Sequence, residues 1–161
     1  MELGDEISID TEKFAVLSNN GTKIKALPYY NLTLNLDSPK QTDQEERIEF
    51  SSSMYWETIN TDVDMYNSAN NIQQYIEAYQ TYLQGIAGNK ITTKVARFSD
   101  VNGSNLKPIL RRYTESQSFW IGTSGECDYM SYVDNGGIFG EMWDDTITIS
   151  GVCPIIEITI P

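Results

Sequence analysis

One segment of this chain has the spacing of an amphipathic α-helix, and the sequence around it alternates like β-strands. The apolar residues of this segment recur at intervals of three and four positions: Ile72, Tyr75, Ile76, Tyr79, Tyr82, Leu83 and Ile86. This spacing predicts a helix from about Asn71 to Gln84 with one buried face. Gly85 and Gly88 supply the stop signal. We expect the tyrosines of this face to belong to the hydrophobic core.

The chain before this helix reads as β structure. A short strand is expected at EISID, and the strand-like segments KFAVLS and TKIKAL flank the turn sequence NNG, which predicts a β-hairpin. The next segment, YYNLTLNL, continues the alternation, so Leu32, Leu34 and Leu36 are expected on one face of a strand. The polar residues 37–47 are expected to form a loop.

The chain after the helix returns to short elements. TTKVARFS predicts a short strand, and SNLKPILRRY predicts a short second helix with Pro108 in its first turn. Several antiparallel strands follow from Ser118 to the end. The last of them, IIEITI, is apolar enough to be central and to pair with the N-terminal hairpin, which would bring the termini together. The order predicts a single α+β domain over residues 1–161.

The charge of the chain limits its partners. Its 11 basic and 23 acidic residues give a net charge of −12. A field of this sign repels phosphate backbones and anionic lipid headgroups, so we expect no nucleic-acid partner. No apolar run approaches the roughly 20 residues that span a bilayer, so we expect no membrane insertion by this chain.

The composition also restricts the chemistry. The chain has no histidine, which excludes Ser-His-Asp and Cys-His catalysis and histidine zinc sites. Its two cysteines, Cys127 and Cys153, either pair or are two buried thiols. The acidic segments TDVDMYN and SDVNGS lack the glycine and the late glutamate of an EF-hand loop, and read as turns and caps. We therefore expect neither a metal nor a cofactor.

Three segments of the C-terminal third carry a family resemblance. FWIGTS, YMSYVDNGGIFG and GVCPIIEI resemble modules with a C-type-lectin-like fold. This set includes variable proteins of diversity-generating retroelements, relatives of the formylglycine-generating enzyme and modules of bacterial surface proteins. The segments LGDEISI, FAVLSNNG and YIEAYQTYL are similar to the same modules, so the likeness covers most of the chain. It implies a C-type-lectin-like fold.

Cys153 departs from this pattern, because the closing motif of the family usually has arginine at its position. That arginine normally helps to hold the C-terminal region. The resemblance therefore makes a Cys127–Cys153 disulfide a candidate replacement for it.

The hairpin around the Asn-Gly-Gly turn is the candidate binding site. In the variable proteins this hairpin forms the binding face. Carried onto this chain, the outward, ligand-binding positions would be Asp128, Met130, Tyr132, Asp134, Phe139, Glu141, Trp143 and Asp145. The inward positions would be Tyr129, Ser131, Val133, Ile138, Gly140 and Met142. The strand period of two gives the same two sets, and the cost of burying four carboxylates assigns the acidic set to solvent.

A second interpretation of the hairpin remains open. Tyr132, Phe139 and Trp143 would then pack beneath a neighbouring loop as part of the core. Trp56 and Trp120 are expected in the core under either interpretation.

These observations lead to a functional expectation. We expect a non-enzymatic ligand-binding or display module outside a cell or on a virus particle, and more specifically a retroelement-diversified variable protein. Its partner would be a protein or a glycan on a cell surface. One alternative is the head domain of a pilin-like or surface-layer protein. Another is a divergent formylglycine-generating-type enzyme that uses Cys127 and Cys153, although Cys153 lies in an apolar strand that disfavours a reactive thiol.

Calcium-dependent sugar binding is a further alternative suggested by the fold family. The segment MWDDT resembles the Trp-Asn-Asp calcium motif of carbohydrate-binding lectins. The matching Glu-Pro-Asn or Gln-Pro-Asp loop is missing, which argues against such a site. The sequence leaves the ligand and the oligomeric state open.

Overall fold

The computed structural model describes most of the chain. The described residues are 1–48, 71–103, 105–106, 108–109, 117–124, 129–133, 139–143 and 150–161. In chain order their elements are β1 (Glu6–Ile9), β2 (Glu12–Asn19), β3 (Lys23–Pro28), α1 (Gln73–Ala87), β4 (Ile91–Val95), α2 (Phe98–Val101), β5 (Phe119–Ser124), β6 (Tyr129–Val133), β7 (Phe139–Trp143) and β8 (Pro154–Thr159).

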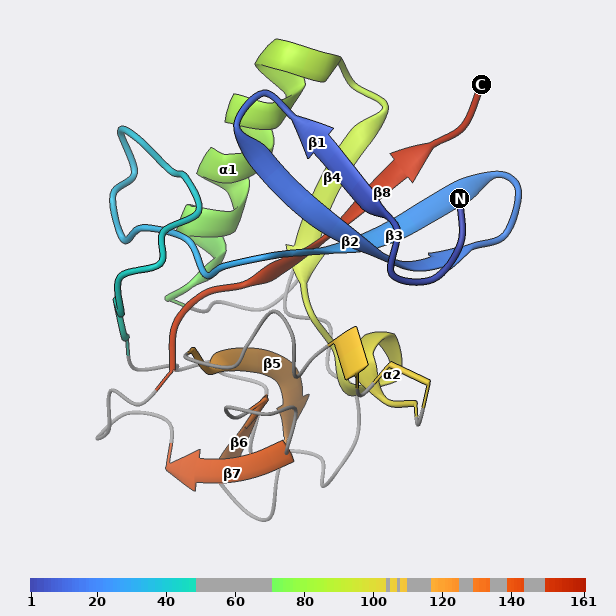
Figure 1. The fold of residues 1–161 in the computed structure, drawn as a ribbon. Helices are drawn as coiled ribbons and strands as arrows, with labels where there is room; N and C mark the ends of the chain where they lie inside the picture. The colour runs from blue at the N-terminus through green and yellow to red at the C-terminus, as the bar shows by residue number, and fades with distance from the viewer. Residues whose placement is uncertain are drawn as a thin grey trace.

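The strands of the described residues form two sheets. Five of them make an antiparallel sheet in the order β1-β2-β3-β8-β4, and three make a smaller sheet in the order β5-β6-β7. In Figure 1, α1 lies beside the larger sheet in the upper half of the view, and the smaller sheet and α2 lie in the lower half. The prediction of an α+β fold is confirmed.

The central strands of the larger sheet are buried on both faces, because alternate residues of each strand belong to two different hydrophobic clusters. Phe14, Ala26 and Ile156 pack with the α1 residues Ile76 and Tyr79. The neighbouring residues of the same strands belong to a second cluster: Ala15, Leu17, Leu27 and Ile155. This cluster also contains residues of α2, β5 and β6: Val101, Phe119, Ile121 and Val133. Strands that are covered on both faces carry apolar residues on both faces, as the segments KFAVL and PIIEI do.

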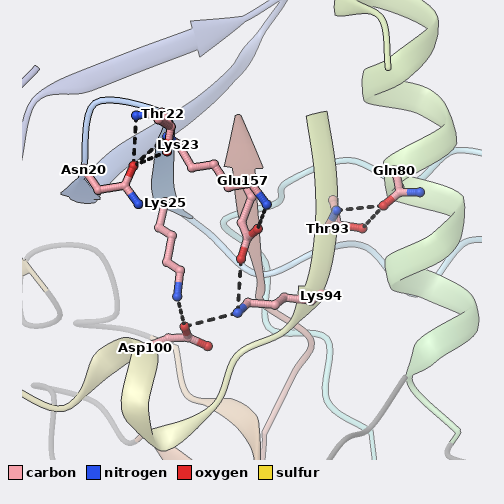
Figure 2. Close-up of polar contacts among 9 residues, drawn as sticks. All are labelled: Asn20, Thr22, Lys23, Lys25, Gln80, Thr93, Lys94, Asp100 and Glu157. Carbon is pink, nitrogen blue, oxygen red and sulfur yellow. Dashed lines mark hydrogen bonds and ion pairs between the residues drawn. The ribbon is translucent and has the colours of Figure 1, made fainter. Parts of the chain in front are cut away.

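The predicted hairpin and the central C-terminal strand are confirmed. β2 and β3 pair across the Asn-Gly turn, and β8 lies between β3 and β4. In the turn, Asn20 Oδ1 accepts hydrogen bonds from the backbone N–H groups of Thr22 and Lys23 (Figure 2). Both chain ends lie on the same side of the molecule (Figure 1). Met1 and Ile158 both line one shallow, mainly apolar pocket.

Gly4 allows the chain to enter the sheet. Its N–H donates to the carbonyl of Val16, and the N–H of Val16 donates to the carbonyl of Asp5. Two residues thus oppose one, which is a β-bulge of the type that needs a left-handed first residue. Gly4 has a φ of 85°, a backbone conformation that residues with a Cβ rarely adopt.

The predicted helix is confirmed with shifted ends. It begins at Gln73 and ends at Ala87, so Gly85 lies inside it and Gly88, with φ of 84°, forms its C-cap. Tyr79 is fully buried, and Tyr75 and Tyr82 pack against the core. Ile86 was wrongly placed on the buried face; it is 47% exposed, because it lies in the last turn near the edge of the sheet.

One prediction on a short segment was wrong, and another was right only in part. Residues 29–36 form no strand: Leu32 makes one isolated bridge, to Gln41, and Leu36 is 46% exposed. Their backbone groups bond to scattered partners rather than to one ladder, since the N–H of Tyr29 donates to Lys13 and that of Leu32 to Val152. The strand predicted over 92–99 ends at Val95, and Phe98 instead begins α2.

The short helix predicted around Pro108 is described only in part. Pro108 and Ile109 are helical, and Ile109 N–H donates to the carbonyl of Leu106. The prediction for Trp120 is confirmed, since this side chain is 1% exposed and its indole N–H donates to the carbonyl of Ile48 at 2.7 Å. Trp56 lies outside the described residues.

Candidate ligand-binding site

The hairpin predicted from the sequence is present as β6 and β7, but its register contradicts the predicted common face. Tyr132 pairs with Gly140, and Val133 pairs with Phe139. Residues paired across an antiparallel ladder share a face of the sheet. Met130 and Tyr132 therefore occupy the opposite face from Phe139, Glu141 and Trp143. The sequence could not reveal this, because the length of the turn sets the register and a slip of one residue exchanges the faces.

Both faces are covered where β6 meets β5. Tyr132 is half-buried and contacts the Trp120 ring edge-on, with ring centroids 5.8 Å apart. Val133 is fully buried in the other core with Phe119. The packing interpretation therefore describes Tyr132 better than the solvent-facing one. Asp128, Asp134 and Asp145 lie outside the described residues, and for Met130, Phe139, Glu141 and Trp143 the structure describes only the backbone.

Cys153 is a free, buried thiol that donates a long hydrogen bond, 3.9 Å, to the carbonyl of Pro28. Burial raises the pKa of this thiol, which disfavours the nucleophilic thiolate. Cys127, the other member of the candidate disulfide, lies outside the described residues.

Asp100 is a buried carboxylate that two lysines hold in place. Its side chain, only 2% exposed, contacts the ammonium groups of Lys25 at 2.9 Å and Lys94 at 3.3 Å (Figure 2). It also accepts the N–H of Arg97 at 3.0 Å, which caps α2 as the sequence suggested. Among the described residues, no group of three or more histidine, cysteine, aspartate or glutamate side chains is arranged to hold a metal.

A pocket near the first β-turn was not predicted from the sequence. It has a volume of about 630 Å³, within the range of small-molecule sites, roughly 300–1,000 Å³. It is formed where the turn between β1 and β2 meets two loop segments. We call this cavity the Glu12 pocket. Its lining consists of Thr11, Glu12, Lys13, Tyr29, Tyr30, Lys40, Gln41, Thr42 and Asp43.

Gln41 holds the walls of the Glu12 pocket together. Its side-chain oxygen accepts the N–H of Tyr30 at 3.2 Å. Its side-chain nitrogen donates to the carbonyl of Lys13 at 2.9 Å and to the hydroxyl of Tyr79 at 3.2 Å. One side chain therefore ties the two loop segments to β2 and α1, which gives the pocket a defined shape.

Glu12 is the buried charge of this pocket, with 4% exposure. One carboxylate oxygen, Oε1, accepts the N–H of Gln41 at 2.8 Å and the hydroxyl of Tyr79 at 2.9 Å. Burial and the charge of Glu12 raise the pKa of Tyr79, so this hydroxyl remains a proton donor at neutral pH. These two donors offset part of the cost of burying the carboxylate.

The other oxygen of Glu12, Oε2, is poorly satisfied. Its contact among the described residues is the Thr11 hydroxyl at 3.5 Å, beyond the usual O–H···O distance of roughly 2.5–3.0 Å. A buried carboxylate oxygen without a short donor is costly, and in a folded protein such a group calls for an explanation, of which a functional role is one.

The sequence carries a signal for the burial of Glu12. Glu12 stands two residues before Phe14 in β2, so strand alternation places it on a buried face. Gln41 has no such signal, because it lies in a polar loop.

Comparisons with known proteins find no relative. No family model matches the chain, and no curated protein or solved structure does. Among the helices of the described chain, none combines the length and apolar character that crossing a membrane requires.

Proposed function

We propose that this protein is a non-enzymatic ligand-binding domain and that the Glu12 pocket is its binding site. The observation that carries this proposal is Glu12 Oε2, a nearly unsatisfied carboxylate oxygen of a buried residue that lines a pocket of about 630 Å³. A bound ligand with a hydroxyl or N–H donor would supply the missing hydrogen bond. Recovering such a bond to a charged group is worth about 1.5–3 kcal/mol.

The rigidity of the pocket also supports binding. The side chain of Gln41 and the Glu12–Tyr79 hydrogen bond fix the walls before a ligand arrives. A preformed site loses less conformational entropy on binding than a flexible one. Tyr30 adds a contact surface, because the residue is 42% exposed and its side chain makes no hydrogen bond or ring contact with another described residue.

The experiment compares two matched tyrosine substitutions at exposed turn threonines. Thr11→Tyr places a large side chain at the pocket, whereas Thr22→Tyr changes the turn between β2 and β3, away from it. Amide spectra of the ¹⁵N-labelled chain are recorded with a library of small sugars, amino acids, amines and carboxylates. We expect ligands that shift the amides of Thr11, Gln41 and Thr42 in the wild type and in Thr22→Tyr but not in Thr11→Tyr.

Two outcomes would overturn this proposal. In one, no compound shifts the pocket amides. In the other, the shifts are the same in Thr11→Tyr, which would locate binding elsewhere on the molecule.

The hairpin is a second candidate surface, and one observation favours it. In the smaller sheet β7 pairs only with β6 among the described strands, and Phe139, Glu141 and Trp143 occupy alternate positions of β7, on one face. The family resemblance extends this to a retroelement-diversified variable protein with a C-type-lectin-like fold, displayed outside a cell or on a virus particle. A near-identical copy of the region encoding residues 118–155 beside a reverse-transcriptase gene would support that reading, and its absence would count against it.

A further inference from the structure

We propose that the ligand of the Glu12 pocket is a neutral, polyhydroxylated molecule, a saccharide unit. This inference rests on the proposed function and adds the chemical class of the ligand. Three properties of the lining carry it: its charge balance, its mixture of donors and acceptors, and its exposed tyrosine.

The charge of the pocket differs from that of the whole chain. The lining contains two carboxylates, Glu12 and Asp43, and two ammonium groups, Lys13 and Lys40, although the chain as a whole carries −12. The lining therefore has no net formal charge. A ligand with a net charge of either sign would meet a like charge inside the pocket, whereas a neutral ligand would not.

The polar groups of the lining match hydroxyl groups. A hydroxyl both donates and accepts a hydrogen bond. One hydroxyl of a saccharide can donate to Glu12 Oε2, and its neighbour on the ring can accept from a lysine ammonium or a threonine hydroxyl of the lining. An amine would satisfy only the carboxylates, and a carboxylate only the lysines.

Tyr30 supplies the apolar part of the recognition. Its backbone N–H donates to the side chain of Gln41, which fixes the backbone, while the residue as a whole remains 42% exposed. A saccharide ring has one face of C–H groups. These groups can pack against the electron-rich face of an aromatic ring while the hydroxyls at the ring edge reach polar partners.

The test uses the full chain, ¹⁵N-labelled, titrated separately with neutral saccharides, simple carboxylates and simple amines. The saccharide panel contains glucose, galactose, mannose and N-acetylglucosamine. We expect at least one saccharide, and neither of the other classes, to shift the amides of Thr11, Gln41 and Thr42. Glu12→Gln should weaken that saccharide roughly tenfold or more, because it removes a charged acceptor.

Tyr30→Ala is the second variant and should weaken the binding of that saccharide about three- to tenfold, since aromatic contacts of this kind contribute modestly to affinity. Tyr30 is 42% exposed, and its side chain makes no hydrogen bond or ring contact with another described residue, so this variant stays informative even if Glu12→Gln unfolds the chain. Ile86→Ala is the matched control. Ile86 is similarly exposed, at 47%, but lies at the end of α1, outside the Glu12 pocket. The Ile86→Ala variant should therefore bind the saccharide with the affinity of the wild type.

The outcomes separate the two proposals. If carboxylates or amines shift the pocket amides and saccharides do not, the ligand class is wrong while the binding site stands. If no compound shifts these amides, both proposals fail. If a saccharide binds Glu12→Gln and Tyr30→Ala as tightly as the wild type, the saccharide site is not this pocket.

Discussion

At the scale of single residues, Asp100 joins α2 to the larger sheet. Its carboxylate contacts Lys25 of β3 and Lys94 of β4, and Lys94 in turn contacts Glu157 of β8 at 3.2 Å (Figure 2). Burial alone would raise the pKa of Asp100, but the hydrogen bonds from Lys25 and Arg97 and the charge of Lys94 outweigh it, so the pKa is lowered. The hydrogen bond to Asp100 likewise raises the pKa of Lys25.

This lowered pKa predicts a specific dependence of stability on pH. Above the ordinary aspartate pKa of 3.8, the carboxylate is ionised in both the folded and the unfolded chain, so its full contribution is present. As the pH falls below that value, the unfolded chain takes up the proton first, and the contribution is lost as the pH falls through the lower pKa of the folded state.

Asp100→Asn should therefore lower the free energy of unfolding by about 1–3 kcal/mol at pH 7, the value of a hydrogen bond to a charged group with partly exposed lysines. Urea unfolding of wild type and variant should show this difference shrinking below about pH 4. Asp37→Asn, at an exposed loop position, is the control and should change stability little. A difference for Asp100→Asn that stays constant down to pH 2.5 would contradict the role assigned to its charge.

At the scale of elements, α1 protects an edge of the larger sheet. β4 is an edge strand, so alternate backbone groups point away from β8. Gln80 accepts the N–H of Thr93 at 2.7 Å, and Gln84 donates to the carbonyl of Ile91 at 2.7 Å (Figure 2 shows the Gln80 contact). The Thr93 hydroxyl donates to the carbonyl of Ile76 at 3.0 Å. Helix side chains therefore occupy edge groups that could otherwise pair with another chain.

Gln80→Ala tests this arrangement. The variant leaves the buried Thr93 N–H without its acceptor, so we expect a loss of about 1–2 kcal/mol in the free energy of unfolding and faster hydrogen exchange at Thr93. Gln74→Ala makes the same change of helix propensity at an exposed position of α1 and should cost much less. Equal losses in the two variants would show that the contact between Gln80 and β4 does not matter.

At the scale of the whole molecule, basic residues are unevenly placed. Lys23, Lys25 and Lys94, three of the 11 basic residues, gather around Asp100 and Glu157, where acidic and basic groups are close to balance (Figure 2). The remaining acids outnumber their counterions, so the folded chain as a whole repels itself.

Salt should therefore stabilise this protein. Screening acts over roughly 10 Å at 0.1 M ionic strength and weakens general repulsion more than it weakens the contacts of the buried Asp100. We expect the melting temperature at pH 7 to rise by a few degrees between about 10 mM and 0.3 M sodium chloride. Differential scanning fluorimetry measures this directly. A melting temperature that falls with salt would mean that the ion pairs, rather than the net charge of −12, dominate the electrostatics.

The features that the sequence by itself determined are those with a local cause. The spacing of Ile76, Tyr79 and Leu83 was enough to predict α1, and the Asn-Gly turn was enough to predict the β2–β3 hairpin. The apolar run of β8 was enough to predict a central strand. In each case the signal lies within a few residues, where periodicity and turn chemistry act.

Only the tertiary structure decided the candidate sites. The Glu12 pocket needs Gln41 and Tyr79, which lie 29 and 67 positions from Glu12 in the chain, and no local pattern links the three. Residues 29–36 alternate like a strand, yet their backbone finds its partners in Lys13, Lys40 and Val152 instead of in one ladder. The faces of β6 and β7 depended on a register that alternation leaves undetermined by one residue. Contacts between distant segments fixed all three features, because they depend on which surfaces meet when the chain packs.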